Sequence, residues 1–148
     1  MKIPFLCQAA SLPESQLGTV QVPYFGRKIK LAGDRTFAPW TITVLNDEDF
    51  IIRNFFETWV NMINSLQGNL LQFTSASPPL YQGLAIATQF SKTGIPLRMY
   101  QFNDLWPSSV SPITLDWAAN DQIESFQVTF EYDYWNIQGG VTGDAGGI

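Results

Sequence analysis

The fold is decided by the stretch Phe126-Gln127-Val128-Thr129-Phe130-Glu131-Tyr132-Asp133-Tyr134, in which apolar and polar side chains alternate throughout. Successive side chains of a β-strand point to opposite faces, so this pattern predicts one long strand with an apolar face and a polar face. Other β-branched or alternating stretches predict strands at residues 41–45 and 113–117, a hairpin at 84–91 and 97–102, and a pair at 18–24 and 27–31. Most of the chain is therefore expected to be strand.

One helix is predicted at about residues 47–66. Apolar side chains recur there at spacings of three and four, which gives the helix one apolar face made of Ile52, Phe55, Phe56, Trp59, Ile63 and Leu66. Asn46 is expected to cap the helix, with the acidic residues 47–49 in its first turn and Gly68 at its end. Several strands and one helix indicate a mainly β fold, a two-sheet antiparallel β-sandwich or partly closed barrel with one flanking helix.

The 148 residues fit one domain, because a chain of this length buries enough surface to hold its own core. We expect residues 1–148 to form this domain, with a flexible glycine-rich tail at about residues 136–148. No apolar run reaches the length of a membrane span and no signal-peptide core is visible, so no membrane insertion is expected. Cys7 is the single cysteine, which excludes an intramolecular disulfide.

The composition favours protein partners. Charged residues make up 14% of the chain, well below the usual share of about a quarter, whereas the chain contains 11 Phe, 5 Trp and 5 Tyr. Aromatic enrichment and charge depletion are typical of the cores of protein interfaces. The net charge of −5 disfavours tight binding to phosphates, although an acidic wall could surround a DNA strand and let it slide.

No set of residues points to catalysis. The chain has no histidine, which removes the commonest general base and leaves Cys7 without an activating imidazole. Glu131 and Asp133 could pair as in a glycosidase, but a solvated strand face explains them more simply. The acidic residues 47–49 match no calcium loop, and the glycines of residues 139–147 lack the spacing of a nucleotide-binding loop. We therefore expect no enzyme, no cofactor and no metal site.

Several motifs occur in an order and spacing that one protein family shares. They are Cys7-Gln8-Ala9-Ala10-Ser11-Leu12-Pro13, the acidic and aromatic stretch 46–59, Phe102-Asn103-Asp104-Leu105-Trp106-Pro107 and the closing stretch 126–135. Across nearly the whole chain the sequence resembles the tail tube protein family of contractile-tailed bacteriophages, which is related to type VI secretion tube proteins. Family members often have a phenylalanine where this chain has Trp106, an exchange of one aromatic residue for another.

The resemblance implies a structural role in the tail of a virion. It implies hexameric rings whose inner sheets join into a barrel around a lumen and which stack into a hollow conduit for DNA delivery inside a contractile sheath. The implied partners are further copies of the chain, the tail sheath protein, the baseplate and tail terminator proteins, and double-stranded DNA that passes through the lumen without sequence-specific binding. Assembly in the host cytoplasm is implied as well.

Three sets of residues are candidates for assembly surfaces. The polar face of the last strand is the candidate for the lumen wall, with Gln127, Thr129, Glu131 and Asp133. The polar side of the helix is the candidate for contact with the sheath, with Arg53, Glu57, Asn61 and Asn64. An arm at residues 18–31 is the candidate for reaching the neighbouring ring, with Tyr24, Phe25, Arg27 and Lys28 near its turn.

Other functions also fit the sequence. The chain could be a baseplate tube initiator or the tube of a phage-derived injection particle, which the copy number in purified particles would separate. A more distant alternative is a carbohydrate-binding β-sandwich module that uses exposed Trp and Tyr side chains to stack on sugars. The tryptophans that could form such a platform are Trp40, Trp59, Trp106, Trp117 and Trp135. The basic cluster at residues 27–30 could bind nucleic acid, but its alternation is more typical of a charged strand edge.

Overall fold

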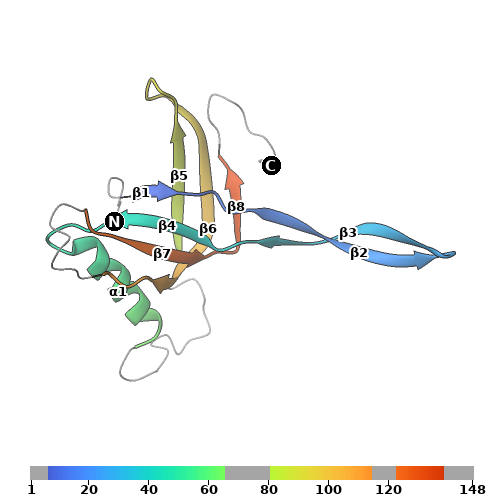
Figure 1. Cartoon of the computed structure of the whole chain (residues 1–148), viewed down its shortest axis with the longest axis horizontal. Helices are drawn as coiled ribbons and strands as arrows, with labels where there is room; N and C mark the ends of the chain where they lie inside the picture. Colours follow the sequence, from blue (N-terminus) through green and yellow to red (C-terminus); the bar gives the residue numbers. More distant parts are fainter. Residues whose placement is uncertain (1–6, 66–80, 115–122, 139–148) are drawn as a thin grey trace.

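The computed structural model describes residues 7–65, 81–114 and 123–138, which form eight strands and one helix. In chain order these are β1 (Cys7–Ala10), β2 (Ser15–Tyr24), β3 (Arg27–Phe37), β4 (Trp40–Leu45), α1 (Ile51–Ile63), β5 (Gly83–Phe90), β6 (Pro96–Val110), β7 (Ser125–Glu131) and β8 (Tyr134–Ile137). Six strands form one antiparallel network that bends into two layers, and β2 and β3 form a separate ribbon (Figure 1). The expected mainly β fold with two antiparallel sheets and one helix is confirmed, without a closed barrel.

The first layer is a four-stranded sheet in the order β1-β4-β7-β6, to which β6 contributes its last part, residues 106–110. β4 and β7 pair in continuous register from Trp40 opposite Phe130 to Leu45 opposite Ser125. Along β7, every second residue from Phe126 to Phe130 is buried, while the residues between them are exposed or half-buried. The alternation read from the sequence therefore separates the two faces of this sheet as predicted.

The second layer shares β6 with the first, because β6 bends at Asp104. The part of β6 before the bend pairs with β5 and β8, and the part after it pairs with β7. Asp104 has a φ of 57°, in the left-handed region that aspartate tolerates better than branched residues do. Figure 1 shows β5 and β8 running across the direction of β4 and β7, as in orthogonal sheet packings where one strand passes between sheets at a bend.

The core lies between the two layers and beneath α1. The indole of Trp40 stacks on the ring of Phe102, with ring centroids 4.1 Å apart, and so joins the first layer to the second. From the helix, Phe56 meets Phe130 edge-on at 5.7 Å, and both Phe56 and Ile52 are buried. The apolar stripe of the helix therefore faces the sheets. No helix in the described part of the chain is long and apolar enough to cross a membrane.

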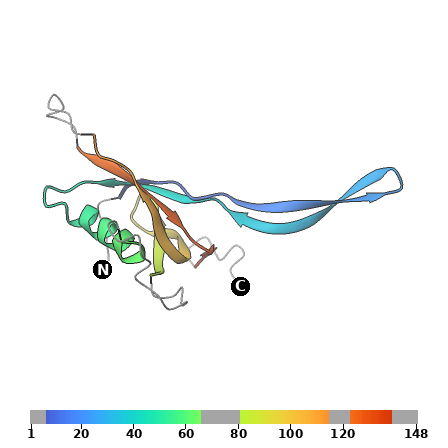
Figure 2. The same ribbon diagram turned by 90° about the horizontal axis from the view of Figure 1, so that it is seen from below.

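The ribbon of β2 and β3 projects from the body as an arm (Figures 1 and 2). Its strands pair from Ser15 opposite Phe37 at the root to Tyr24 opposite Arg27 at the tip. The turn consists of Phe25 and Gly26, with φ values of 44° and 75°, the two positive values that a type I′ turn requires. The hairpin predicted at residues 18–31 is confirmed and is longer at its root than predicted.

Two strand predictions were partly wrong. The stretch 126–134 is not one strand, because the chain leaves the sheet after Glu131 and resumes as β8 in the second layer. Beyond the break the burial no longer follows the sequence alternation, because Tyr134 is 49% exposed while Trp135 and Ile137 pack against the core. Ile113 and Thr114 are not in a strand, and residues 115–117 lie outside the described residues. Asn136 and Ile137, expected in the flexible tail, belong to β8, and residues 139–148 also lie outside the described part.

The helix begins at Ile51, four residues later than predicted. Asn46 does not cap it, because its backbone N–H donates to the Glu124 carbonyl oxygen at 2.8 Å and its Nδ2 donates to Glu124 Oε2 at 2.7 Å. These bonds prolong the strand pairing instead. Phe50 occupies the N-cap position with a φ of 52° and no side-chain cap, so the acidic residues precede the helix. α1 ends at Ile63, and residues 66–68, expected at its end, lie outside the described residues.

Substitutions at Asp104 test the bend in β6. We expect Asp104→Val to lower the free energy of unfolding by about 1–2 kcal/mol, because a β-branched residue is strained at positive φ. Asp104→Gly should leave that free energy unchanged or raise it slightly, since glycine adopts this conformation without strain. Urea unfolding followed by tryptophan fluorescence measures both variants. Equal stability of the two variants would contradict a strained bend at this position.

Candidate assembly surfaces

The free face of the four-stranded sheet is polar and nearly uncharged. Gln127 and Thr129 lie on it opposite Thr43 and Thr41, and the hydroxyl oxygens of Thr41 and Thr129 are 3.2 Å apart. Gln127 is exposed, whereas Thr129 and Glu131 are half-buried. Glu131 is the only charged residue in the four strand segments that form this sheet. The structure thus brings three of the four predicted lumen residues onto one face.

Asp133, the fourth predicted lumen residue, does not share this face. It lies in the break between β7 and β8, where its backbone N–H donates to the carbonyl oxygen of Asn103 at 3.1 Å. Its side chain is exposed. The spacing of two between Glu131 and Asp133 therefore does not place their carboxylates on one strand, which also removes the geometric reason for pairing them as catalytic acids.

Both edges of the four-stranded sheet are open among the described strands. β1 pairs with β4 alone, and residues 106–110 of β6 pair with β7 alone. All four residues of β1 are exposed. Each neighbouring pair in the sheet is antiparallel, so strand directions alternate and the two edge strands run in opposite directions. The β1 edge of one copy can therefore continue the β6 edge of another with the same antiparallel pairing.

The polar side of α1 is only partly free. Arg53 is held by its own chain, because its Nε donates to Glu57 Oε1 at 2.7 Å and another guanidinium nitrogen donates to the Ser111 carbonyl oxygen at 3.2 Å. Glu57 and Asn64 are exposed, and Asn61 is half-buried. The four predicted sheath residues lie along one side of the helix, but the guanidinium of Arg53 already has partners within the subunit.

The tryptophans do not form a platform for sugars. Trp40 is buried in the core, and Trp59, Trp106 and Trp135 are half-buried. Trp117 lies outside the described residues. A sugar-stacking site needs the flat face of an aromatic ring in solvent. No tryptophan in the described ranges is exposed, whereas Tyr24 at the arm tip and Tyr134 at the start of β8 are. The described residues therefore offer no exposed tryptophan platform to a sugar.

The two faces of the arm differ in character. Residues directly opposite each other share a face, and one face is exposed and apolar, with Val20, Val22, Tyr24, Ile29 and Leu31. The opposite face carries Lys28 and Lys30. The four predicted arm residues all lie at the tip, where Tyr24 is opposite Arg27, Phe25 is in the turn and Lys28 begins the basic face. The arm is thus a two-faced ribbon with a basic side.

A β-bulge sets which residues share each face. Between the pairs Leu17–Arg35 and Thr19–Ala32, β3 has one residue more than β2. Gly18 lies at this point, where a Cβ would come within 3.0 Å of the Asp34 carbonyl oxygen. Had the pairing continued without the extra residue, every side chain of β3 beyond it would have changed face. The lysines would then have shared a face with the valines of β2.

Tyr132 fixes the root of the arm to the body. Its phenol donates a hydrogen bond to the carbonyl oxygen of Ala38, just after β3, at 2.6 Å. Its ring meets Phe37 at 6.0 Å and Phe102 at 5.2 Å, both edge-on, and so links the arm to the core. Burial, with a smaller contribution from the charge of Glu131, raises the pKa of Tyr132 to about 12. The phenol therefore keeps its proton at neutral pH.

Tyr132 and the bulge were not among the sequence candidates. A signal for the bulge was present, because Gly18 and Gly33 lie at equal distances from the predicted turn, and glycine inside a strand often marks a bulge. Tyr132 gave no comparable signal, since it continues the alternation of residues 126–134. Its role follows from contacts with residues far away in the sequence.

Comparison with known proteins identifies the family of the chain. The family described as phage tail tube protein matches residues 2–138. The chain belongs to this family. It is 38% identical to the tail tube protein gp19 of Enterobacteria phage T4 over 132 residues, covering 88% of this chain and 79% of that protein. The tube protein is thus a structural subunit and a component of a virion tail.

Solved structures share the fold of the tube protein. A chain in the sheath/tube terminator of the extracellular contractile injection system PVC matches with a TM-score of 0.68 at 16% identity, covering 93% of the tube protein and 86% of that chain. The Hcp1 protein of E. coli matches with a TM-score of 0.51 at 14% identity, covering 92% and 75%. At such identities the likeness concerns the fold alone.

Removing the phenol of Tyr132 tests the root of the arm. We expect Tyr132→Phe to lower the free energy of unfolding by about 1 kcal/mol at neutral pH, because the ring contacts stay and one hydrogen bond is lost. The unfolded phenol ionises near pH 10 and the folded one near pH 12, so wild-type stability falls as the pH rises through this window. The difference in free energy of unfolding between the wild type and Tyr132→Phe should therefore shrink between pH 10 and pH 12. A constant difference from pH 8 to pH 12 would contradict this reasoning.

Proposed function

We propose that the tube protein closes into hexameric rings, and that the rings stack into a hollow conduit for DNA delivery inside a contractile sheath. The observation that carries this proposal is the pair of open, oppositely directed edges of the four-stranded sheet, β1 and residues 106–110. Contact between two different surfaces of identical copies repeats around an axis until a ring closes. In such a ring the sheets of all copies form one continuous antiparallel barrel.

The free polar face of the sheet lines the lumen in this arrangement, because the other face is covered by the core and α1. Gln127, Thr129 and Glu131 lie on this face. Affinity for DNA comes mainly from Lys and Arg contacts with phosphates, and the four strand segments contain neither residue. Hydroxyl, amide and sparse acidic groups leave DNA free to slide. Asp133 lies off this face, and the proposal does not include it.

The remaining surfaces serve the other partners. The exposed side of α1, with Glu57 and Asn64, is turned to the sheath protein, and the arm tip reaches the neighbouring ring. The end rings meet the baseplate and the tail terminator. Chains with this fold occur in the sheath-tube complex and in the sheath/tube terminator of PVC, which supports these assignments by analogy of fold. Assembly takes place in the host cytoplasm.

No catalytic role is part of this proposal. The family is one of structural tail proteins. Within the described ranges, no group of three or more His, Cys, Asp or Glu side chains could hold a metal ion. The function of the protein is the association of its copies. The free energy for that association comes from surfaces that a single copy leaves uncovered, namely the sheet edges and the arm.

Removing β1 tests ring closure. Deletion of residues 1–10 should preserve the fold, because β1 is exposed and pairs with β4 alone, but it should abolish rings. It leaves β4 at the edge, which runs parallel to β6 and cannot reproduce the antiparallel joint. Circular dichroism checks the fold, and negative-stain microscopy at high protein concentration shows rings or tubes. Deletion of residues 1–6 keeps β1 and is the matched control. Normal rings from the longer deletion would refute the proposed joint.

Reagent size tests which face lines the lumen. The exposed Cys7 is first replaced by serine, and single cysteines are then introduced as Gln127→Cys or Glu57→Cys. In assembled tubes a small maleimide should label both positions. A maleimide attached to a particle wider than the lumen should label only the Glu57→Cys protein, whereas in dispersed subunits it should label both. Labelling of Gln127→Cys in intact tubes by the large reagent would place this face outside.

A further inference from the structure

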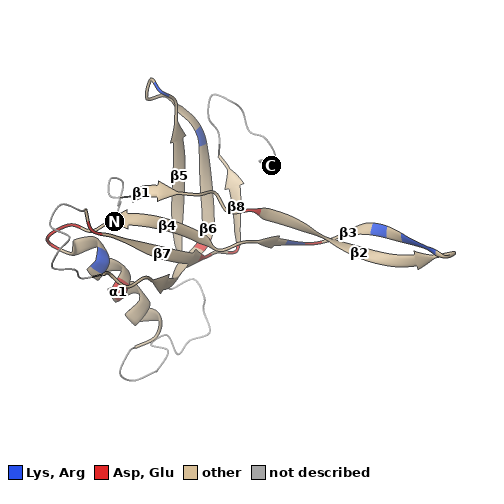
Figure 3. Cartoon of the chain, viewed as in Figure 1, with Lys and Arg blue, Asp and Glu red and all other residues tan. Residues whose placement is uncertain are grey.

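The arm carries charge opposite to that of the body. Residues 15–37 hold four of the eight Lys and Arg residues and a single acid, which gives the arm a net charge of +3. Since the whole chain carries −5, the rest of it carries −8. Figure 3 shows the cations along the arm and a group of acids at the opposite end of the molecule. The subunit is therefore electrically polar along its longest axis.

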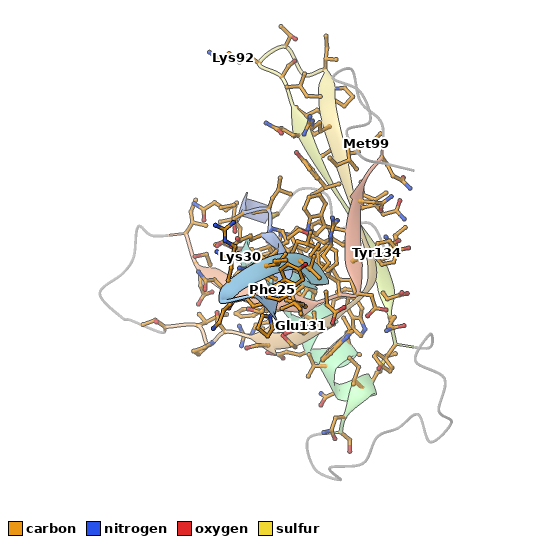
Figure 4. All side chains as sticks on the ribbon, turned by 90° about the vertical axis from the view of Figure 1, so that its right-hand side faces the viewer. Phe25, Lys30, Lys92, Met99, Glu131 and Tyr134 are labelled. Carbon is orange, nitrogen blue, oxygen red and sulfur yellow. The ribbon has the colours of Figure 1, made fainter. Side chains whose placement is uncertain are left out.

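The arm tip exposes a strained aromatic residue beside these cations. Phe25 is 91% exposed and has a φ of 44°, at a turn position that favours Asn, Asp or Gly. An exposed, strained phenylalanine destabilises a free subunit, and such outliers occur where a residue serves binding. Lys28 and Lys30 follow it on the basic face, with no ion pair to any described residue. Figure 4 looks along the arm onto Phe25 and Lys30.

The opposite end of the body has the complementary chemistry. This acidic end consists of Asp47, Glu48, Asp49, Phe50, Ile51, Ile123 and Glu124. The three acids before Phe50 are exposed, and the two hydrogen bonds between Asn46 and Glu124 hold their turn against the start of β7. Phe50, Ile51 and Ile123 are 41%, 52% and 75% exposed, so this end also exposes apolar side chains next to the acids in the sequence. Phe50 also has a positive φ of 52°.

The cation nearest to the acidic end in the sequence is already engaged. Arg53 is the nearest cation in the sequence, and it forms an ion pair with Glu57 at 2.7 Å while its guanidinium lies over the ring of Phe126. Strand β4, the turn and the start of β7 contain no Lys or Arg. Among the described residues no Lys or Arg forms an ion pair with these acids, so they are available to a basic partner.

We infer that the acidic end is the docking site for the arm tip of a second copy in the next ring. This inference rests on the proposed function and names the contact that joins successive rings. The two surfaces lie at opposite ends of the long axis (Figures 1 and 3), so the contact joins unlike surfaces and repeats along a line. Phe25 meets the exposed apolar side chains of the acidic end, and the lysines meet its acids, so the two surfaces are complementary in both chemistry and charge.

Charge reversal on both sides tests the contact. Lys28→Glu with Lys30→Glu should still give rings, because the sheet edges are unchanged, but should raise the protein concentration needed for tube growth by about tenfold or more. Glu48→Lys with Asp49→Lys should have the same effect. A chain with all four substitutions pairs opposite charges again and should regain tubes. Lys92→Glu, on the exposed turn between β5 and β6, is the matched control and should leave tube growth unchanged.

A substitution at Phe25 separates binding from folding. Phe25→Asn creates an Asn-Gly turn, which suits the type I′ geometry better than phenylalanine does. The melting temperature of the free subunit should therefore stay the same or rise. Tube growth should nevertheless weaken several-fold, because the apolar anchor of the arm is lost. If Phe25 served the fold alone, tube growth by this variant would be unchanged, and the inference would lose its apolar contact.

The outcomes separate this inference from the proposed function. Absence of rings and tubes from the wild-type protein would refute the proposed function itself. Normal tubes from the variant with the reversed arm would overturn the docking site and leave ring closure intact. Failure of the four-substitution chain to regain tubes would also overturn it. Sedimentation and negative-stain microscopy at low and high salt provide the measurements.

Discussion

A strand at the edge of a sheet leaves part of its backbone N–H and C=O groups without a strand partner, and this constraint governs the tube protein. Many monomeric proteins protect such edges with charged side chains. The two edges of the four-stranded sheet contain no charged residue, whereas β2 and β3 of the arm contain five. Pairing of these edges with other chains is limited by their geometry instead. β1 has only four residues, and residues 106–110 of β6 include Pro107 and a bulge. Short, uncharged edges of opposite direction suit pairing with another copy and disfavour extended aggregation.

In the proposed tube, contacts between copies within a ring and contacts between successive rings use different interactions. Within a ring, backbone hydrogen bonds between sheet edges are directional and depend little on salt. Between rings, the arm offers exposed lysines and an aromatic tip, and such charge pairs weaken when the Debye length falls below about 10 Å. A tube built in this way consists of firm rings joined by contacts that ionic strength can modulate. Tyr132 links the two systems, because its phenol holds the arm root at Ala38 while its ring packs on Phe102 in the core.

The sequence predicted the elements that follow from the pattern of neighbouring residues. It missed the features that depend on contacts between segments far apart in the chain. Alternation in β7 and the apolar stripe of α1 follow from burial of one face, and both were predicted. The predicted helix start was wrong although Asn46 and the acids after it form a good capping signal. Asn46 instead forms two hydrogen bonds with Glu124 that extend the pairing of β4 with β7. The bend at Asp104 and the break after Glu131 depend on how two layers meet. Among the candidate surfaces, the arm tip residues were identified, but the bulge decides which of them share a face.

The charge polarity of the subunit also restricts how copies can meet wrongly. Two arms, each with a net charge of +3, repel one another, and two acidic ends do the same. Only the contact between an arm and an acidic end is attractive, so the electrostatics that favour stacking also exclude head-to-head and tail-to-tail pairs. An exposed apolar arm face would otherwise associate with its own kind. If arms dock on acidic ends as proposed, Lys28 and Lys30 on the opposite face of the same ribbon would keep free subunits apart and would give a growing tube a single direction.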